Sequence, residues 1–157
     1  MTATYALALG SNRRSRFGSP ERTIAAALRA IGGVRAASPV MRTAAMGPSS
    51  RAFANAVALV GSDEDPPTML ARVKAIERAF GRRRGRRWGA RVIDIDLVLW
   101  SGGAWTGPGL VVPHAAYRTR DFVLRPLTAV APGWRDPVGG RTARQLLALV
   151  DRRAPRP

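Results

Sequence analysis

The fold is decided by residues 92–99, which read Val-Ile-Asp-Ile-Asp-Leu-Val-Leu. Residues two apart on a β-strand point to the same face of a sheet. As a strand, this stretch would place Asp94 and Asp96 side by side on one face. The opposite face would be filled by four aliphatic side chains, Ile93, Ile95, Leu97 and Leu99. The segment from Arg91 to Trp100 is therefore predicted to be one strand with a charged face and an apolar face.

The chain around this strand alternates between strand and helix patterns. Apolar patterning predicts strands at 4–9, 34–43 and 53–60, and helices from Pro20 to Ile31 and through Met69 to Phe80. Ser19 before Pro20 is typical of a helix start, and Gly32 of a helix end. The order with the strand at 91–100 is βαββαβ, which predicts an α+β domain with a ferredoxin-like sheet and helices packed on it.

C-terminal additions follow this core. Glycines between 102 and 109 indicate a loose hairpin, and apolar spacing predicts helices at 122–130 and 142–150. We expect one domain over residues 1–157, with a frayed tail at 154–157.

Asp94 and Asp96 are the sharpest chemical signal. Two neighbouring carboxylates repel each other, and a divalent cation is a natural compensation. Oxygen ligands suit Mg²⁺, which takes one or two carboxylates and completes its octahedron with water and phosphate oxygens. Arginines on an exposed sheet face could neutralise the same pair, and the motif alone does not decide between the two interpretations.

An arginine-rich stretch directly precedes the strand. Residues 82–91 read Arg-Arg-Arg-Gly-Arg-Arg-Trp-Gly-Ala-Arg, which predicts a mobile cationic loop that could close over phosphates. Trp88 could offer an aromatic face to a base. A solvated basic loop or a nucleic-acid contact patch is the alternative. The adjacent acid pair favours a phosphate and metal site, because such sites combine both charges.

Two further candidates lie outside these stretches. His114 is the only histidine, and it could donate to a phosphate, although a lone histidine is more often structural. Asn55 lies on an apolar strand near Phe53, with Phe122 further along the chain. A buried amide must be satisfied, either by the backbone or by the edge of a flat heterocycle held between the two rings.

Together these motifs resemble the hydroxymethyldihydropterin pyrophosphokinase family. The matching stretches, in family order and at near-family spacing, are Leu9–Asn12, Phe53–Ala56, Arg87–Leu97, Val112–His114 and Phe122–Leu127. The resemblance implies transfer of the two terminal phosphates of ATP, as one pyrophosphoryl unit, to the hydroxymethyl group of a reduced pterin. AMP would be released, and the product would serve folate biosynthesis.

The resemblance also implies roles for single residues. Catalytic roles fall to Arg82, Arg91, Asp94 and Asp96, and the two aspartates would hold two Mg²⁺ ions. ATP contacts fall to Glu77, Arg84, Trp88, Arg91, His114 and Arg120. The pterin site falls to Thr43, Phe53, Asn55 and Phe122.

Composition bounds the partners. The chain has 26 basic and 10 acidic residues, a net charge of +16, and such a field attracts polyanions. Every basic residue except Lys74 is arginine, which indicates codon bias behind part of the excess. There is no cysteine, no apolar run of membrane-spanning length and no secretory signal. We expect a cytoplasmic monomer that acts on small molecules, with no membrane or nucleic-acid partner.

Two other functions stay open at this point. A basic ferredoxin-like RNA-binding module would need exposed aromatic residues on its central strands, and Asp94 and Asp96 would repel the RNA backbone. Another Mg²⁺-dependent nucleotide transferase would share the metal site and differ in its acceptor. Only Phe53, Asn55 and Phe122 argue against that second alternative.

Overall fold

The computed structural model describes residues 2–43, 52–81 and 92–153. The predicted arginine-rich loop and the tail at 154–157 lie outside these ranges. Within the described part of the chain, no helix is both long enough and apolar enough to cross a membrane.

The main sheet has the predicted ferredoxin-like topology. Its strands are β1 (Ala3–Ser11), β2 (Val34–Ala37), β3 (Met41–Thr43), β4 (Phe53–Ser62) and β5 (Asp94–Trp100). They lie in the order β2-β4-β1-β5 with antiparallel neighbours, and β3 extends the sheet beside β4. Both helical crossovers therefore skip one strand, as the βαββαβ pattern requires. The predicted α+β fold class is confirmed.

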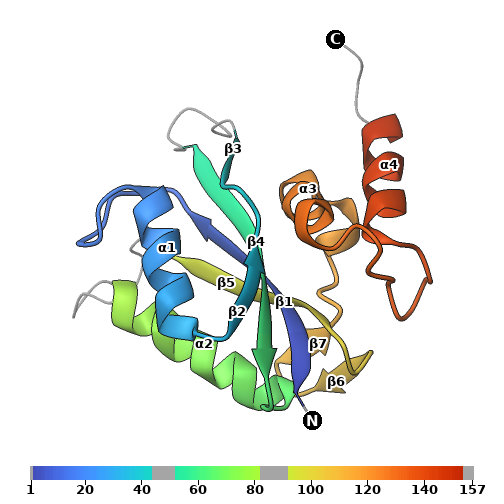
Figure 1. Cartoon of the computed structure of the whole chain (residues 1–157), viewed down its shortest axis with the longest axis horizontal. Helices are drawn as coiled ribbons and strands as arrows, with labels where there is room; N and C mark the ends of the chain where they lie inside the picture. The colour runs from blue at the N-terminus through green and yellow to red at the C-terminus, as the bar shows by residue number, and fades with distance from the viewer. Residues whose placement is uncertain (1, 44–51, 82–91, 154–157) are drawn as a thin grey trace.

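Helices cover both faces of this sheet (Figure 1). The helices are α1 (Pro20–Ile31), α2 (Pro66–Gly81), α3 (Asp121–Val130) and α4 (Ala143–Arg153), with a hairpin of β6 (Trp105–Gly107) and β7 (Leu110–Val112) and a 3₁₀ turn, η1 (Tyr117–Thr119). On one face, Leu7 and Ile95 pack with Ile24 of α1 and Met69 of α2. On the other face, Val57 packs beneath α3 and α4. Each such buried side chain stabilises the fold by about 1.5–3 kcal/mol.

The helix start predicted at Ser19 is confirmed. Its side-chain oxygen accepts a hydrogen bond of 3.3 Å from the Arg22 N–H, and Pro20 occupies the first turn. Gly32 ends α1 with φ of +70°, and its N–H donates to the Leu28 carbonyl. These contacts satisfy backbone groups that the helix ends leave unpaired.

The strands differ in extent from the sequence prediction: β1 and β4 are longer than expected, and two further differences concern the site side of the sheet. The strand expected from Arg91 begins at Asp94. The single β-like segment 34–43 is two strands, separated at Ser38, whose Oγ accepts a 3.0 Å hydrogen bond from the Val57 N–H.

The prediction that Leu99 shares a face with Ile95 is wrong. Leu97 lies opposite Leu7, but Leu99 lies opposite Ala6, so β5 carries one extra residue at this point. Such a β-bulge reverses the alternation of the strand. Leu99 therefore packs in the cluster beneath α3 and α4.

A partly buried ion pair connects the C-terminal additions. Arg118 of η1 forms a bidentate pair with Asp136, with a distance of 2.9 Å from Nη2 to Oδ1. Asp136 is only 3% exposed, and its Oδ1 also accepts a hydrogen bond from the Val138 N–H. The Arg118 hydrogen bonds outweigh the effect of burial and lower the pKa of Asp136 to about 2.

Asp136→Asn is expected to lower the free energy of unfolding by about 2 kcal/mol at pH 7. The folded pKa of Asp136 lies below its unfolded value, so this stabilisation is present above pH ~4 and is lost as the pH falls toward 2. Urea unfolding of both proteins at pH 6 and pH 2.5 measures it, and the difference between them should shrink at the lower pH. Asp151→Asn, in a half-exposed pair with Arg125, is the control and should cost less than about 1 kcal/mol. A difference in the free energy of unfolding that did not change with pH would contradict a lowered pKa of Asp136 in the pair with Arg118.

Candidate active site

The acid pair faces two small residues of β1. Asp94 and Asp96 are the first and third residues of β5, so both lie on the face opposite to Ile95. Gly10 of β1 is the partner of Asp94, and Ala8 is the partner of Asp96. Gly10 is also the partner of Asn55 on β4. A row Asn55–Gly10–Asp94 therefore crosses three strands on one face of the sheet.

Gly10 forms the floor of this row. A Cβ atom at Gly10 would lie 3.2 Å from Asn55 Oδ1, closer than an ordinary contact. Two strand spacings separate β4 from β5, which is about 10 Å. With glycine at this position, the Asn55 amide can lie close to β1, between β4 and the carboxylates of β5.

Three predicted pterin residues gather at the β3–β4 end of the row. Thr43 pairs with Phe53 across the two strands. Asn55 is 7% exposed, and its Nδ2 donates to Thr43 Oγ1 at 3.3 Å. Phe53 is more than a third exposed, so its ring is accessible beside the amide.

The fourth predicted pterin residue, Phe122, lies in the first turn of α3. It packs against the cluster beneath α3 and α4. The Arg120 guanidinium lies over its ring, 5.6 Å from the centroid. Arg120 and Phe122 thus form one unit at the start of α3. A sandwich of Phe122 with Phe53 stays a prediction.

Glu77 connects α2 to the acid strand. Its Oε1 accepts a 2.7 Å hydrogen bond from the N–H of Ile95, the residue between the two aspartates. Its other oxygen pairs with Lys74 Nζ at 3.2 Å, and the Glu77 side chain is only 8% exposed. Glu77 was predicted at the nucleotide site, and the structure gives its carboxylate a definite structural task beside that site.

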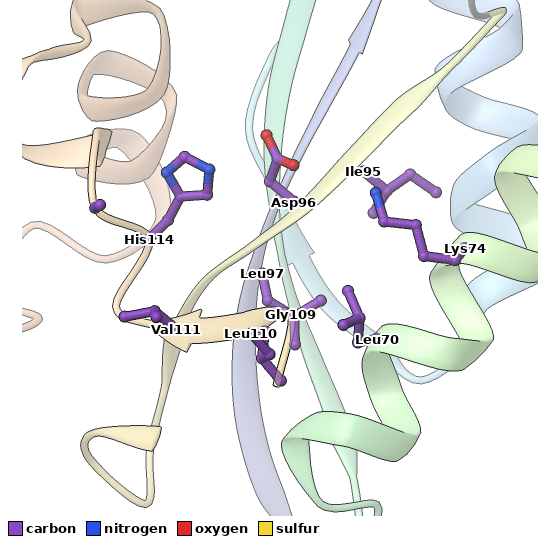
Figure 2. A pocket seen from close by; sticks show the side chains of 10 residues that line it. Leu70, Lys74, Ile95, Asp96, Leu97, Gly109, Leu110, Val111 and His114 are labelled. Carbon is purple, nitrogen blue, oxygen red and sulfur yellow. The ribbon is translucent and has the colours of Figure 1, made fainter. Parts of the chain in front are cut away.

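A cavity of about 300 Å³ opens between α2, β5 and the segment after β7. Figure 2 shows Asp96, His114 and Lys74 around it, each from a different one of these elements. Its remaining lining is largely apolar and comprises Leu70, Ile95, Leu97, Gly109, Leu110, Val111 and Ala115. An apolar pocket with a few polar groups at its edge suits a small ligand with a flat apolar part.

His114 is fixed on the wall of this cavity. Its backbone N–H donates to the Val98 carbonyl at 3.0 Å. Its Nδ1 accepts from the Ala116 N–H at 3.2 Å, so a neutral ring carries its proton on Nε2. The predicted role of His114 as a donor thus has a defined atom.

Four predicted site residues, Arg82, Arg84, Trp88 and Arg91, lie outside the described residues. Lys74 lines the cavity and was missed, although its place as the only lysine, one turn before Glu77, was a usable signal. Across 2–43, 52–81 and 92–153, no three His, Asp or Glu side chains cluster as a metal cage. Two carboxylates still suit Mg²⁺, because water and phosphate oxygens can supply its other ligands.

Fold and site together fit an enzyme that transfers a phosphate group between small molecules. The family model for 7,8-dihydro-6-hydroxymethylpterin-pyrophosphokinase (HPPK) matches residues 6–132. The chain belongs to this family.

Relatives and solved structures agree with this membership. A 2-amino-4-hydroxy-6-hydroxymethyldihydropteridine pyrophosphokinase of Methylorubrum extorquens is 40% identical over 96% of this chain and 95% of its own length. The protein of the same name from Synechocystis is 37% identical, and its match covers 70% of this chain and 56% of that relative. The structure of wild-type Plasmodium falciparum HPPK-DHPS has a TM-score of 0.75 at 14% identity, over 95% of this chain and 43% of that one. At that identity the likeness establishes the fold.

Glu77→Ala is expected to accelerate amide hydrogen exchange at Ile95 by about tenfold or more, because a hydrogen bond to a charged group is worth about 1.5–3 kcal/mol. Exchange followed by NMR measures this residue by residue. Glu21→Ala removes a carboxylate that pairs with Arg42 at the surface, and it should leave Ile95 unchanged. Equal exchange at Ile95 in wild type and Glu77→Ala would show that the bond does not hold the strand.

Proposed function

We propose that this protein transfers pyrophosphate from ATP to 6-hydroxymethyl-7,8-dihydropterin and releases AMP, in folate biosynthesis. The observation that carries the proposal is the row Asn55–Gly10–Asp94. It gives a flat acceptor an amide at one edge and the acid pair at the other. The cavity beside Asp96, with Lys74 and His114 at its edge, would take the nucleotide.

Asp94 and Asp96 would hold two Mg²⁺ ions. Their shared face on β5 and their oxygen ligands fit hard cations that also bind phosphate. Bound there, the ions would neutralise the triphosphate and orient the attacking hydroxyl. The bond between Ile95 and Glu77 would keep the two carboxylates in register.

In the transfer, the pterin hydroxyl oxygen attacks the β-phosphorus of ATP. The bond from that phosphorus to the α–β bridging oxygen breaks, AMP carries the bridging oxygen away, and the hydroxyl proton passes to solvent. Such transfers depend on position and electrostatics more than on covalent help. His114 Nε2–H and Arg120 would donate to phosphate oxygens. Arg82, Arg84 and Arg91 would stabilise the moving charge, and Trp88 would contact the base.

Thr43, Phe53 and Asn55 would bind the pterin, with Phe122 covering its second face. The hydrogen bond from Asn55 to Thr43 orients the amide, so its Oδ1 is turned toward Gly10 and can accept from the ring edge. A cytoplasmic location and a monomeric state remain predictions from the sequence.

The proposal is tested by AMP formation from ATP and Mg²⁺, with and without 6-hydroxymethyl-7,8-dihydropterin. AMP that forms only with the pterin supports both reaction and acceptor. Asp96→Ala should lower this rate by roughly 10²–10³-fold or more with an unchanged melting temperature. Asp63→Ala, at an exposed aspartate, is the matched control. AMP formed equally without pterin would point to another acceptor, and full activity of Asp96→Ala would remove the metal assignment.

Gly10→Val should raise the KM for the pterin by about tenfold or more, a loss of about 1.4 kcal/mol, with little change in the KM for ATP. Its side chain would occupy the floor beside Asn55 Oδ1. Steady-state kinetics with each substrate varied in turn measures the two effects. Gly133→Val, at a glycine with open space around it, controls for the added side chain. An equal rise in both KM values would argue against a pterin site on this floor.

A further inference from the structure

A tight turn between β1 and α1 is built to hold its two central residues in place. Ser15 and Gly18 exchange two backbone hydrogen bonds of 3.0 Å. Ser15 Oγ accepts from the Phe17 N–H at 3.0 Å and is bonded to Thr23 Oγ1 of α1 at 2.7 Å. Gly18 has φ of +108°, a value that favours glycine. Arg16 and Phe17 are therefore presented by a turn that is anchored on α1.

Both side chains contact the last turn of α2. The Phe17 ring stacks on Phe80, with centroids 4.3 Å apart and planes 27° apart. The Arg16 guanidinium lies 4.9 Å from the Phe17 centroid, and its Nη2 donates to the Ala79 carbonyl at 3.0 Å. That carbonyl is one of the four that a helix leaves unpaired at its C-terminus, where positive charge is also favourable.

The same end of α2 lies against the residues that lead into β5. Glu77 lies one turn before Phe80 and bonds to Ile95. At the helix end, a Cβ at Gly81 would lie 3.3 Å from Val92, so the two backbones approach closely. Ser11, at the end of β1 and 1% exposed, donates to the Val92 carbonyl at 2.7 Å.

We propose that Arg16 and Phe17 are positioning residues for the acid pair: they fix the last turn of α2, and Glu77 passes this restraint through Ile95 to Asp94 and Asp96. Ser11 restrains the entrance of the same strand from the β1 side. The residues that touch substrate are unchanged by this role. Its catalytic consequence rests on the proposed function, whereas its structural consequence does not.

The test is amide hydrogen exchange in Phe17→Ala, measured by NMR on the full chain without ATP, metal or pterin. Exchange at Ile95 should accelerate by about tenfold relative to wild type, while exchange at Leu7 in the central strand stays the same. Phe17→Tyr, which retains a ring, should restore slow exchange. Arg16→Ala should act in the same direction as Phe17→Ala. Its matched control is Arg135→Ala, which also removes an arginine that donates to a backbone carbonyl, that of Gly140 at 2.8 Å.

The catalytic arm uses the same variants. In Phe17→Ala, kcat for AMP formation should fall by about tenfold and the Mg²⁺ concentration for half-maximal rate should rise, with both KM values within about twofold of wild type. Unchanged exchange at Ile95, or equal acceleration at Ile95 and Leu7, would overturn the positioning role. If wild type formed no AMP, the proposed function would fail, and exchange at Ile95 would still decide the positioning role.

Discussion

The site depends on one hydrogen bond at the edge of the sheet. Among the described residues, β1 is the one strand of the main sheet that pairs with β5, so β5 presents backbone groups on its outer side. An unpaired N–H on an edge strand lowers the stability of the fold when it is buried, and it can pair with another chain when it is exposed. At Ile95 the side chain of Glu77 supplies the acceptor, with its Oε1 at 2.7 Å from the backbone nitrogen. Because Ile95 separates Asp94 from Asp96, the same bond would also restrain the positions of both carboxylates, as proposed above.

The second requirement is space beside those carboxylates. Central strands usually carry large β-branched side chains, and glycine weakens a strand by roughly 0.5–1 kcal/mol relative to alanine. Gly10 and Ala8 nevertheless stand where β1 faces Asp94 and Asp96. Pairing with β4 on one side and β5 on the other offsets that weakness. The small residues of β1 thus lower local strand stability and let the amide of Asn55 and the acid pair share one face of the sheet.

Local patterns predicted much of this arrangement. Strict alternation placed Asp94 and Asp96 on one face, and Ser19-Pro20 set the start of α1. The contacts that could not be predicted from the sequence are those between segments far apart in the chain. The bulge that turns Leu99 depends on the pairing of β5 with β1. The Glu77 hydrogen bond depends on how α2 packs against β5. The stack of Phe17 on Phe80 depends on contact between the β1–α1 turn and the last turn of α2.

The overall positive charge of the protein bears on which substrate the acid pair would serve. A net charge of +16 attracts polyanions such as ATP. Glu21, Glu64 and Asp136 lie in ion pairs with arginine, and their charges contribute to the stability of the fold. In the proposed reaction, a metal ion carried by the triphosphate would bind where Asp94 and Asp96 share one face of β5. The same face would repel a nucleic-acid backbone, so the basic surface favours the nucleotide substrate over the RNA-binding alternative.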